Sequence, residues 1–288
     1  MLATWTDQGA KSDVLAKELK PMKQFFFSLS VLMIALLTVS TILMGQSTMN
    51  VNFVNSPSST IHIAPMDTVA FPAFANHFAA GRGAVQPASI VLSNESDRSI
   101  VGLVVVWTIV DKSGASHRLT GGTDSFWDSR YAKIIDPHAR TLAFPGGFLS
   151  ESLANAPHIG RPITSQRIQE FSNASQVNVE IDCVIDDTGA VLGPNSSRLD
   201  ENITARIVAA AEVVGLVRNA ENAGQDYSDV LRPFATAAVQ VSAGDRFSFW
   251  KTFFAKQLLN SKNLDIDLAR LQLPPLPKFN YVGNGGEK

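Results

Sequence analysis

The chain has 288 residues, 45% of them hydrophobic, and its 24 Lys and Arg nearly balance its 26 Asp and Glu. This balance leaves no basic excess and argues against nucleic acid as a partner. The one cysteine, Cys183, excludes an internal disulfide, and its position excludes a lipid anchor on a cysteine at an N-terminal cleavage site.

The first predicted element is the apolar segment at residues 25–44, which reads FFFSLSVLMIALLTVSTILM and has no charged side chain. A helix of this length can cross the hydrocarbon layer of a bilayer. Lysines precede the segment, and the first charge after it is Asp67. Because positive charges stay on the cytoplasmic side, we expect the chain beyond residue 44 to be exported.

Two interpretations of residues 25–44 stay open. Met22 and Lys23 before the segment, with the small residue Gly45 after it, are typical of a cleaved secretory signal. The apolar stretch is longer than a usual signal core, which favours a retained membrane anchor. We therefore predict residues 1–47 as a cytoplasmic stub followed by a signal peptide or an anchoring hydrophobic helix. It is also open whether residues 1–21 are translated.

Residues 48–197 contain short apolar segments separated by turns rich in Gly, Pro, Asn and Asp, which predicts β-structure. Residues 100–110 are apolar almost throughout, as in a central strand covered on both faces. The clearest strand is at residues 177–186, where apolar and polar residues alternate. The residues predicted to share its buried face are Val177, Val179, Ile181, Cys183 and Ile185.

Two turns have nearly the same sequence, VDKSGA at residues 110–115 and IDDTGA at residues 185–190. The glycine in each is what a short hairpin loop requires. Either an internal repeat or two hairpins of one sandwich explains the similarity. We favour one sandwich, because the segments around the two turns differ.

A core tryptophan, Trp107, and a core cysteine on a much later strand, Cys183, resemble the arrangement of an immunoglobulin-like domain, although no cysteine lies near residues 90–92. Residues 88–195 also resemble uncharacterised exported bacterial proteins with a strand, an Asn-x-Ser turn, a long strand, an Asp-x-x-Gly turn and terminal helices. The resemblance implies a mainly β fold, an immunoglobulin-like antiparallel β-sandwich with an α-helical C-terminal extension. It implies no chemistry.

Residues 198–265 change to helical spacing, and residues 266–288 form a tail rich in Pro and Gly. A helix that begins after Asp245 has an aromatic face and a basic face. This combination is typical of a helix that lies on a membrane, whereas docking of the aromatic face onto the rest of the protein is the alternative. The candidate membrane or partner contacts are Phe247, Trp250, Lys251, Phe254 and Leu258.

No GxSxG, HExxH or P-loop pattern is present, and the five histidines are scattered. We therefore predict no catalytic residue, no metal site and no cofactor, and we interpret Cys183 as a buried thiol. One loop, residues 124–131, combines aromatic and charged side chains, the mixture that stacks on sugars or peptides. Its candidate binding residues are Asp124, Phe126, Trp127, Asp128, Arg130 and Tyr131.

Together these patterns predict an exported, non-enzymatic envelope or extracellular module that binds a partner protein or surface, with a membrane contact through residues 25–44. One alternative is an exported hydrolase or carbohydrate-binding protein that uses the loop with Phe126, Trp127 and Tyr131. Another is a membrane-tethered assembly component. The sequence identifies neither the ligand nor the oligomeric state.

Overall fold

A computed structural model describes residues 49–54, 57–78, 82–127, 133–153, 163–236, 245–275 and 278–282. The chain divides into two compact units, Met1–Thr48 and Met49–Lys288, and all described residues belong to the second. The predicted stub and hydrophobic helix at residues 25–44 lie outside the described residues. Among the helices within these ranges, none has the length and apolar composition that a bilayer crossing requires.

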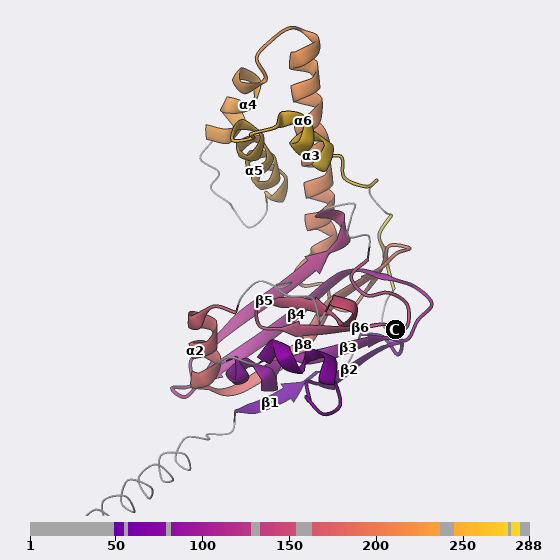
Figure 1. Ribbon diagram of the computed structural model, residues 1–288, viewed down its shortest axis with the longest axis vertical. Helices are drawn as coiled ribbons and strands as arrows, with labels where there is room; N and C mark the ends of the chain where they lie inside the picture. Colours follow the sequence, from indigo (N-terminus) through magenta and orange to yellow (C-terminus); the bar gives the residue numbers. More distant parts are fainter. Residues whose placement is uncertain are drawn as a thin grey trace, which may run out of the picture. The chain divides into compact units, whose positions relative to one another are not determined.

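Among the described residues the larger sheet has six strands, and its main path runs β10-β9-β8-β4-β5. Figure 1 labels β8, β4 and β5 of this path. Neighbours along β9-β8-β4-β5 are antiparallel, whereas β10 pairs with β9 and β1 pairs with β8 in parallel. The bounds are β1 (Asn50–Phe53), β4 (Ile100–Asp111), β5 (Ser116–Asp124), β8 (Ala174–Asp186), β9 (Ala190–Leu192) and β10 (Asn280–Tyr281).

The smaller sheet has four antiparallel strands in the order β2-β3-β6-β7. Hydrophobic side chains of both sheets share one buried cluster with helix α2 (Ser165–Asn173) and with two 3₁₀ helices, η1 and η2. The bounds are β2 (Ile61–Pro65), η1 (Pro72–Phe78), η2 (Gly83–Ala88), β3 (Ile90–Asn94), η3 (Ser125–Trp127), β6 (Arg140–Phe144), β7 (Gly147–Ser150) and η4 (Glu151–Leu153).

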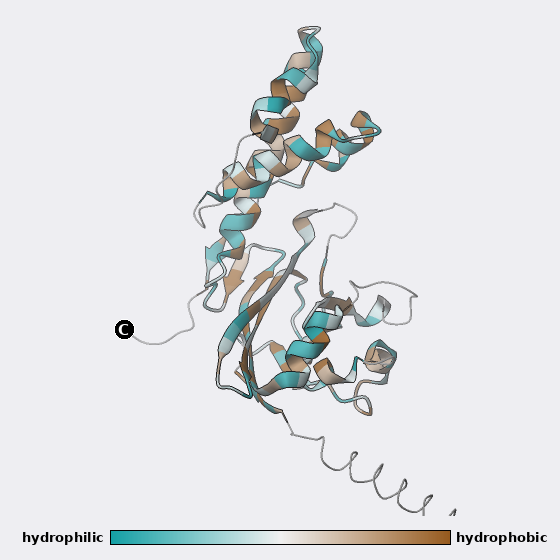
Figure 2. Ribbon diagram, turned by 90° about the vertical axis from the view of Figure 1, so that its left-hand side faces the viewer, coloured by the Kyte–Doolittle hydropathy of each residue, from teal (hydrophilic) through white to brown (hydrophobic). Residues whose placement is uncertain are grey.

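Helix α3 (Leu199–Asn222) belongs to two hydrophobic clusters. Leu199 and Ile203 in its first turns pack against residues of β4, β8 and β9 on the second face of the larger sheet. Its later turns pack with α4 (Tyr227–Thr236), α5 (Arg246–Leu259) and α6 (Leu264–Arg270) in a separate helical cluster. Each of these helices carries hydrophobic and hydrophilic residues, as required of helices with one buried face (Figure 2).

The predicted immunoglobulin-like antiparallel β-sandwich is wrong. The larger sheet is mixed, because β1 and β10 join it in parallel. Helix is also more than an extension of the β-structure, since α2 contributes to one hydrophobic cluster of the larger sheet and α3 to the other. The physical reason for the error is that alternating hydrophobicity shows that a strand has two faces, but not the direction of its neighbour.

The two residues that suggested the immunoglobulin arrangement lie on opposite faces of the larger sheet. Trp107 belongs to the cluster shared with the smaller sheet, and Cys183 to the cluster shared with α3. The cause is a β-bulge in β8: Val104 pairs with Cys183 and Val105 with Ile181, so Asp182 is an extra residue. The predicted single face of residues 177–185 is therefore wrong, since the alternation changes face at Asp182.

Candidate functional site

Strand β5 is an edge strand of the larger sheet. Within the described ranges it pairs with β4 alone, from Gly102 opposite Asp124 to Val110 opposite Ser116. An edge strand presents backbone N–H and C=O groups that can pair with another chain. Its sequence, SHRLTGGTD, has two consecutive glycines in the interior. Glycine at such a position weakens a strand and marks places where a ligand or another backbone approaches closely.

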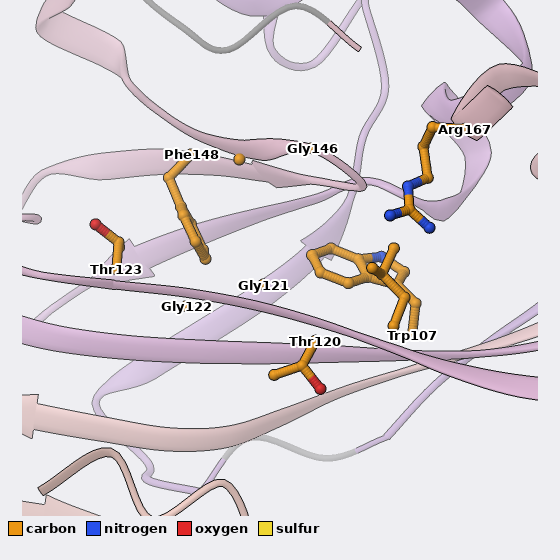
Figure 3. Close-up of a pocket in the computed structure, with 10 residues that line it drawn as sticks. Trp107, Thr120, Gly121, Gly122, Thr123, Gly146, Phe148 and Arg167 are labelled. Atoms are coloured by element: carbon orange, nitrogen blue, oxygen red, sulfur yellow. The ribbon is translucent and has the colours of Figure 1, made fainter. Parts of the chain in front are cut away.

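A groove of about 710 Å³ lies beside this strand (Figure 3). Residues 119–123 of β5 form one side, and residues 146–148, at the turn from β6 to β7, form the other. Trp107 of β4 and Arg167 of α2 complete the lining. Since four of the lining residues are glycines, much of the surface that a ligand would meet is backbone.

Gly121 is required by the packing of Trp107. A Cβ atom at position 121 would lie 2.9 Å from Cζ3 of the indole ring. The ring cannot move away easily, because Trp107 is fully buried and its Nε1 donates a 2.7 Å hydrogen bond to the carbonyl of Ala88. The groove therefore combines a rigid aromatic base with a strand edge that carries little side-chain bulk.

Arg167 is the one charged side chain among the lining residues that the structure describes. It stands in the first turn of α2, where its backbone N–H donates to the Thr164 side chain that caps the helix. Its Nη1 donates a 2.5 Å hydrogen bond to Oε2 of Glu170, and its side chain is 29% exposed. Figure 3 shows the guanidinium directed toward the Trp107 indole. Within the described segments, the lining residues include no carboxylate, imidazole or thiol; they offer hydrogen bonds and the guanidinium of Arg167.

The loop predicted to bind a ligand is only partly described. Asp124 and Phe126 are buried. The Asp124 carboxylate pairs with the guanidinium of Arg206 and accepts a 3.0 Å hydrogen bond from the Phe126 backbone N–H. Trp127 ends η3. Asp128, Arg130 and Tyr131 lie outside the described residues, so a binding role for this loop stays a prediction.

The aromatic face predicted on α5 packs inside the protein. Trp250, Phe254 and Leu258 are buried in the helical cluster, and Phe247 packs against it. The Trp250 Nε1 donates a 2.9 Å hydrogen bond to Asn202 on α3. Lys251 pairs with Glu212 of α3 and lies 3.8 Å from the centre of the Phe234 ring on α4. This face therefore docks onto the rest of the protein, which was the alternative to a membrane contact.

The structure also locates the groups considered for metal or thiol chemistry. In the described part of the chain, no group of three or more His, Cys, Asp or Glu side chains is placed to hold a metal ion. Cys183 is fully buried, as predicted, and burial, followed by the nearby Asp182 and Asp200 charges, raises its thiol pKa to about 12. Such a thiol stays protonated and is a poor nucleophile at neutral pH.

The sequence interpretation did not identify the groove. One feature of the β5 sequence could have indicated it: the pair Gly121–Gly122 inside an otherwise strand-like segment. Arg167 and Phe148 had no such signal, because they reach β5 only through the folding of the chain. Comparisons with protein-family models, with curated proteins and with solved structures find no match for this chain.

Proposed function

We propose that this protein is an exported, non-enzymatic module that binds an extended segment of a partner protein by adding it as a strand beside β5, at the edge of the larger sheet. In this mode backbone hydrogen bonds supply affinity, and pockets for alternate side chains supply specificity. The observation that carries the proposal is the Gly121–Gly122 pair in an edge strand that borders a groove.

The dimensions of the groove fit a short strand. At about 3.3 Å per residue, residues 119–123 of β5 run for roughly 16 Å. Side chains on one face of an added strand repeat every second residue, so two or three of them would face the groove. A groove of about 710 Å³ has room for side chains of this number.

The lining supports binding rather than catalysis. Phe148 and Leu119 offer apolar contact, and Thr123 offers a hydroxyl. A hydrolase needs a nucleophile with a base, or a metal-bound water, and the lining residues in the described ranges include no candidate base. Export is supported by the uncharged segment at residues 25–44 and the lysines before it.

The proposal is tested by selecting peptides from a displayed library of random nonapeptides on the purified full chain. Binding of a selected peptide is then measured by fluorescence anisotropy, and backbone amide hydrogen exchange of β5 is compared with and without the peptide. Strand addition predicts slower exchange of the outward-facing amides at residues 119–123. A peptide that leaves these amides unprotected, or a library without binders, would overturn the proposal.

A matched pair of variants supplies the control. Figure 3 shows the Thr123 side chain on the groove side of β5 and the Thr120 side chain directed away. Thr123→Phe fills the groove and should weaken the peptide roughly tenfold or more, which corresponds to about 1.4 kcal/mol. Thr120 belongs to the same stretch of the groove edge, but it pairs with Val106, whose side chain lies on the opposite face of the sheet from Trp107. Thr120→Phe therefore puts the same ring on that opposite face and should leave the affinity within about twofold. Equal effects of the two variants would contradict binding in the groove.

A further inference from the structure

We propose that the groove is specific for an acidic segment: the strand that adds to β5 carries an internal Asp or Glu whose carboxylate pairs with Arg167. This inference rests on the proposed function and names the chemistry of its ligand. It follows from the charge of the lining, the geometry of the guanidinium and the course of β5 past it.

The charge of the lining is positive. Of the lining residues that belong to the described part of the chain, Arg167 is the one that is charged, and none is acidic. The start of α2 borders the same groove, because a Cβ at Gly146 would lie 3.4 Å from Cγ1 of Ile163. The N-terminal end of a helix carries a partial positive charge, so it adds to the field of the guanidinium. With a side chain 29% exposed, Arg167 is screened less than an arginine fully in water.

Glu170 positions the guanidinium without using all of its donors. It accepts from Nη1, and no further side-chain hydrogen bond of Arg167 is present in the part of the chain that the structure describes. A guanidinium has five N–H donors in a planar fork, and the edge formed by Nε and Nη2 can hold a second carboxylate with two hydrogen bonds. Because Glu170 already balances the formal charge of the guanidinium, the unused N–H donors and the N-terminal end of α2 favour one additional carboxylate rather than several.

The course of β5 favours an internal acidic side chain over a free C-terminus. Figure 3 shows the guanidinium beside Trp107, which pairs with Leu119. Strand β5 continues on both sides of Leu119, back to Ser116 and forward to Asp124. A strand that pairs along this edge therefore extends beyond Arg167 on both sides. The ligand group next to the guanidinium is then a side chain and not the terminal carboxylate. A Lys or Arg at that ligand position would face a like charge, which adds discrimination.

The test uses the peptides selected from the random library. We expect them to share one Asp or Glu at a fixed position. Replacement of that residue by Asn or Gln should weaken binding on the order of tenfold to a hundredfold, as expected for a charged hydrogen bond. Arg167→Gln should weaken the parent peptide by a similar factor. On Arg167→Gln, the acidic and the amide peptides should bind alike, because the coupling is lost.

Three controls make the outcomes distinct. Arg118→Gln removes another arginine, one that lies on β5 itself and pairs with Glu180, and it should change the affinity less than about threefold. C-terminally amidated peptides should bind as well as free acids; a strict need for a free C-terminus would overturn the internal side chain. Circular dichroism melts establish that each variant is folded.

The inference and the function it rests on fail in different ways. Peptides that protect the β5 amides but share no acidic position, and bind Arg167→Gln as well as the parent chain, would overturn the acidic specificity and leave strand addition in place. A library that yields no peptide at all would overturn the proposed function itself.

Discussion

The carboxylate of Asp124 at the end of β5 pairs with the guanidinium of Arg206 in α3, and the two side chains are 4% and 1% exposed. This ion pair joins the strand that borders the groove to the helix that connects the sheet with the helical cluster. The Arg206 guanidinium also lies 5.5 Å from the ring centre of Trp250 on α5. One buried cation of α3 thus contacts the end of a strand and a second helix.

We predict that Arg206→Met destabilises the protein by about 3–5 kcal/mol, because it leaves the buried Asp124 carboxylate without its cation. The double variant Asp124→Asn with Arg206→Met should recover part of this loss, since the uncompensated charge is gone. Urea unfolding measures both. The control is Arg232→Met in α4, whose partner Asp229 is exposed, and it should change the free energy of unfolding by less than about 1 kcal/mol. A double variant no more stable than the single one would contradict this account.

The two glycines of β5 should respond differently to the same small change. A Cβ at Gly121 would lie 2.9 Å from the Trp107 ring, whereas a Cβ at Gly122 would lie 3.4 Å from Cγ2 of Val104, close to ordinary contact. Gly121→Ala should therefore destabilise the protein by about 1–3 kcal/mol through overpacking. Gly122→Ala should be nearly neutral or stabilising, because alanine loses less backbone freedom on folding. Urea unfolding of both variants provides the comparison, and equal free energies would contradict it.

Local structure with its own chemical signature was predictable from the sequence. In both similar turns, an aspartate carboxylate accepts hydrogen bonds from the residues two and four positions later, and the glycine has positive φ, 87° at Gly114 and 85° at Gly189. Both turns join paired antiparallel strands, β4 with β5 and β8 with β9, although the single sandwich predicted to contain these hairpins is wrong. Asp, Ser or Thr, and Gly at fixed spacing determine such a turn without help from the rest of the chain.

Features that depend on distant segments were not predictable. The alternation of apolar and polar residues does not reveal the bulge at Asp182, because β8 has apolar residues on both of its faces after this position. Its carboxylate accepts hydrogen bonds from the backbone N–H groups of Ser196 and Ser197, a partnership across more than a dozen residues. Likewise, β10 joins the sheet from the predicted tail through pairing with β9, although two residues carry no strand periodicity. The candidate groove also depends on distant segments, since Arg167 comes close to β5 only in the folded chain.

The aromatic residues of α5 allow a direct test of docking against surface exposure. Trp250 is 7% exposed in the helical cluster, whereas Phe253 on the same helix is 42% exposed. Trp250→Ala should destabilise the protein by about 3–5 kcal/mol, because it removes a large buried ring and leaves a cavity. Phe253→Ala should cost less than about 1 kcal/mol. Thermal unfolding followed by circular dichroism compares the two, and similar losses would contradict the burial of the Trp250 face.

The lowered pKa of His77 leads to a prediction of how the free energy of unfolding depends on pH. Its ring lies 4.2 Å from the Phe144 ring centre, and its buried Nε2 has no hydrogen-bond partner within the described residues. Burial, and then the positive charge of Arg82, lower the pKa of His77 from 6.5 to about 4. Between these two values the unfolded chain binds a proton that the folded chain does not bind. The contribution of His77 to the free energy of unfolding therefore falls as the pH falls from about 6.5 to about 4, and it is constant below that range.

The measurement is urea unfolding of the wild-type chain and of His77→Phe at a series of pH values from 7 to 4. His77→Phe keeps an aromatic ring against Phe144 and cannot be protonated, so the difference in unfolding free energy between the two proteins should shift in favour of the variant as the pH falls. His117→Gln, at an exposed position of β5, is the matched control and should follow the wild-type pH dependence. A constant difference between wild type and His77→Phe across this range would show that His77 takes its proton equally well in the folded and unfolded chains.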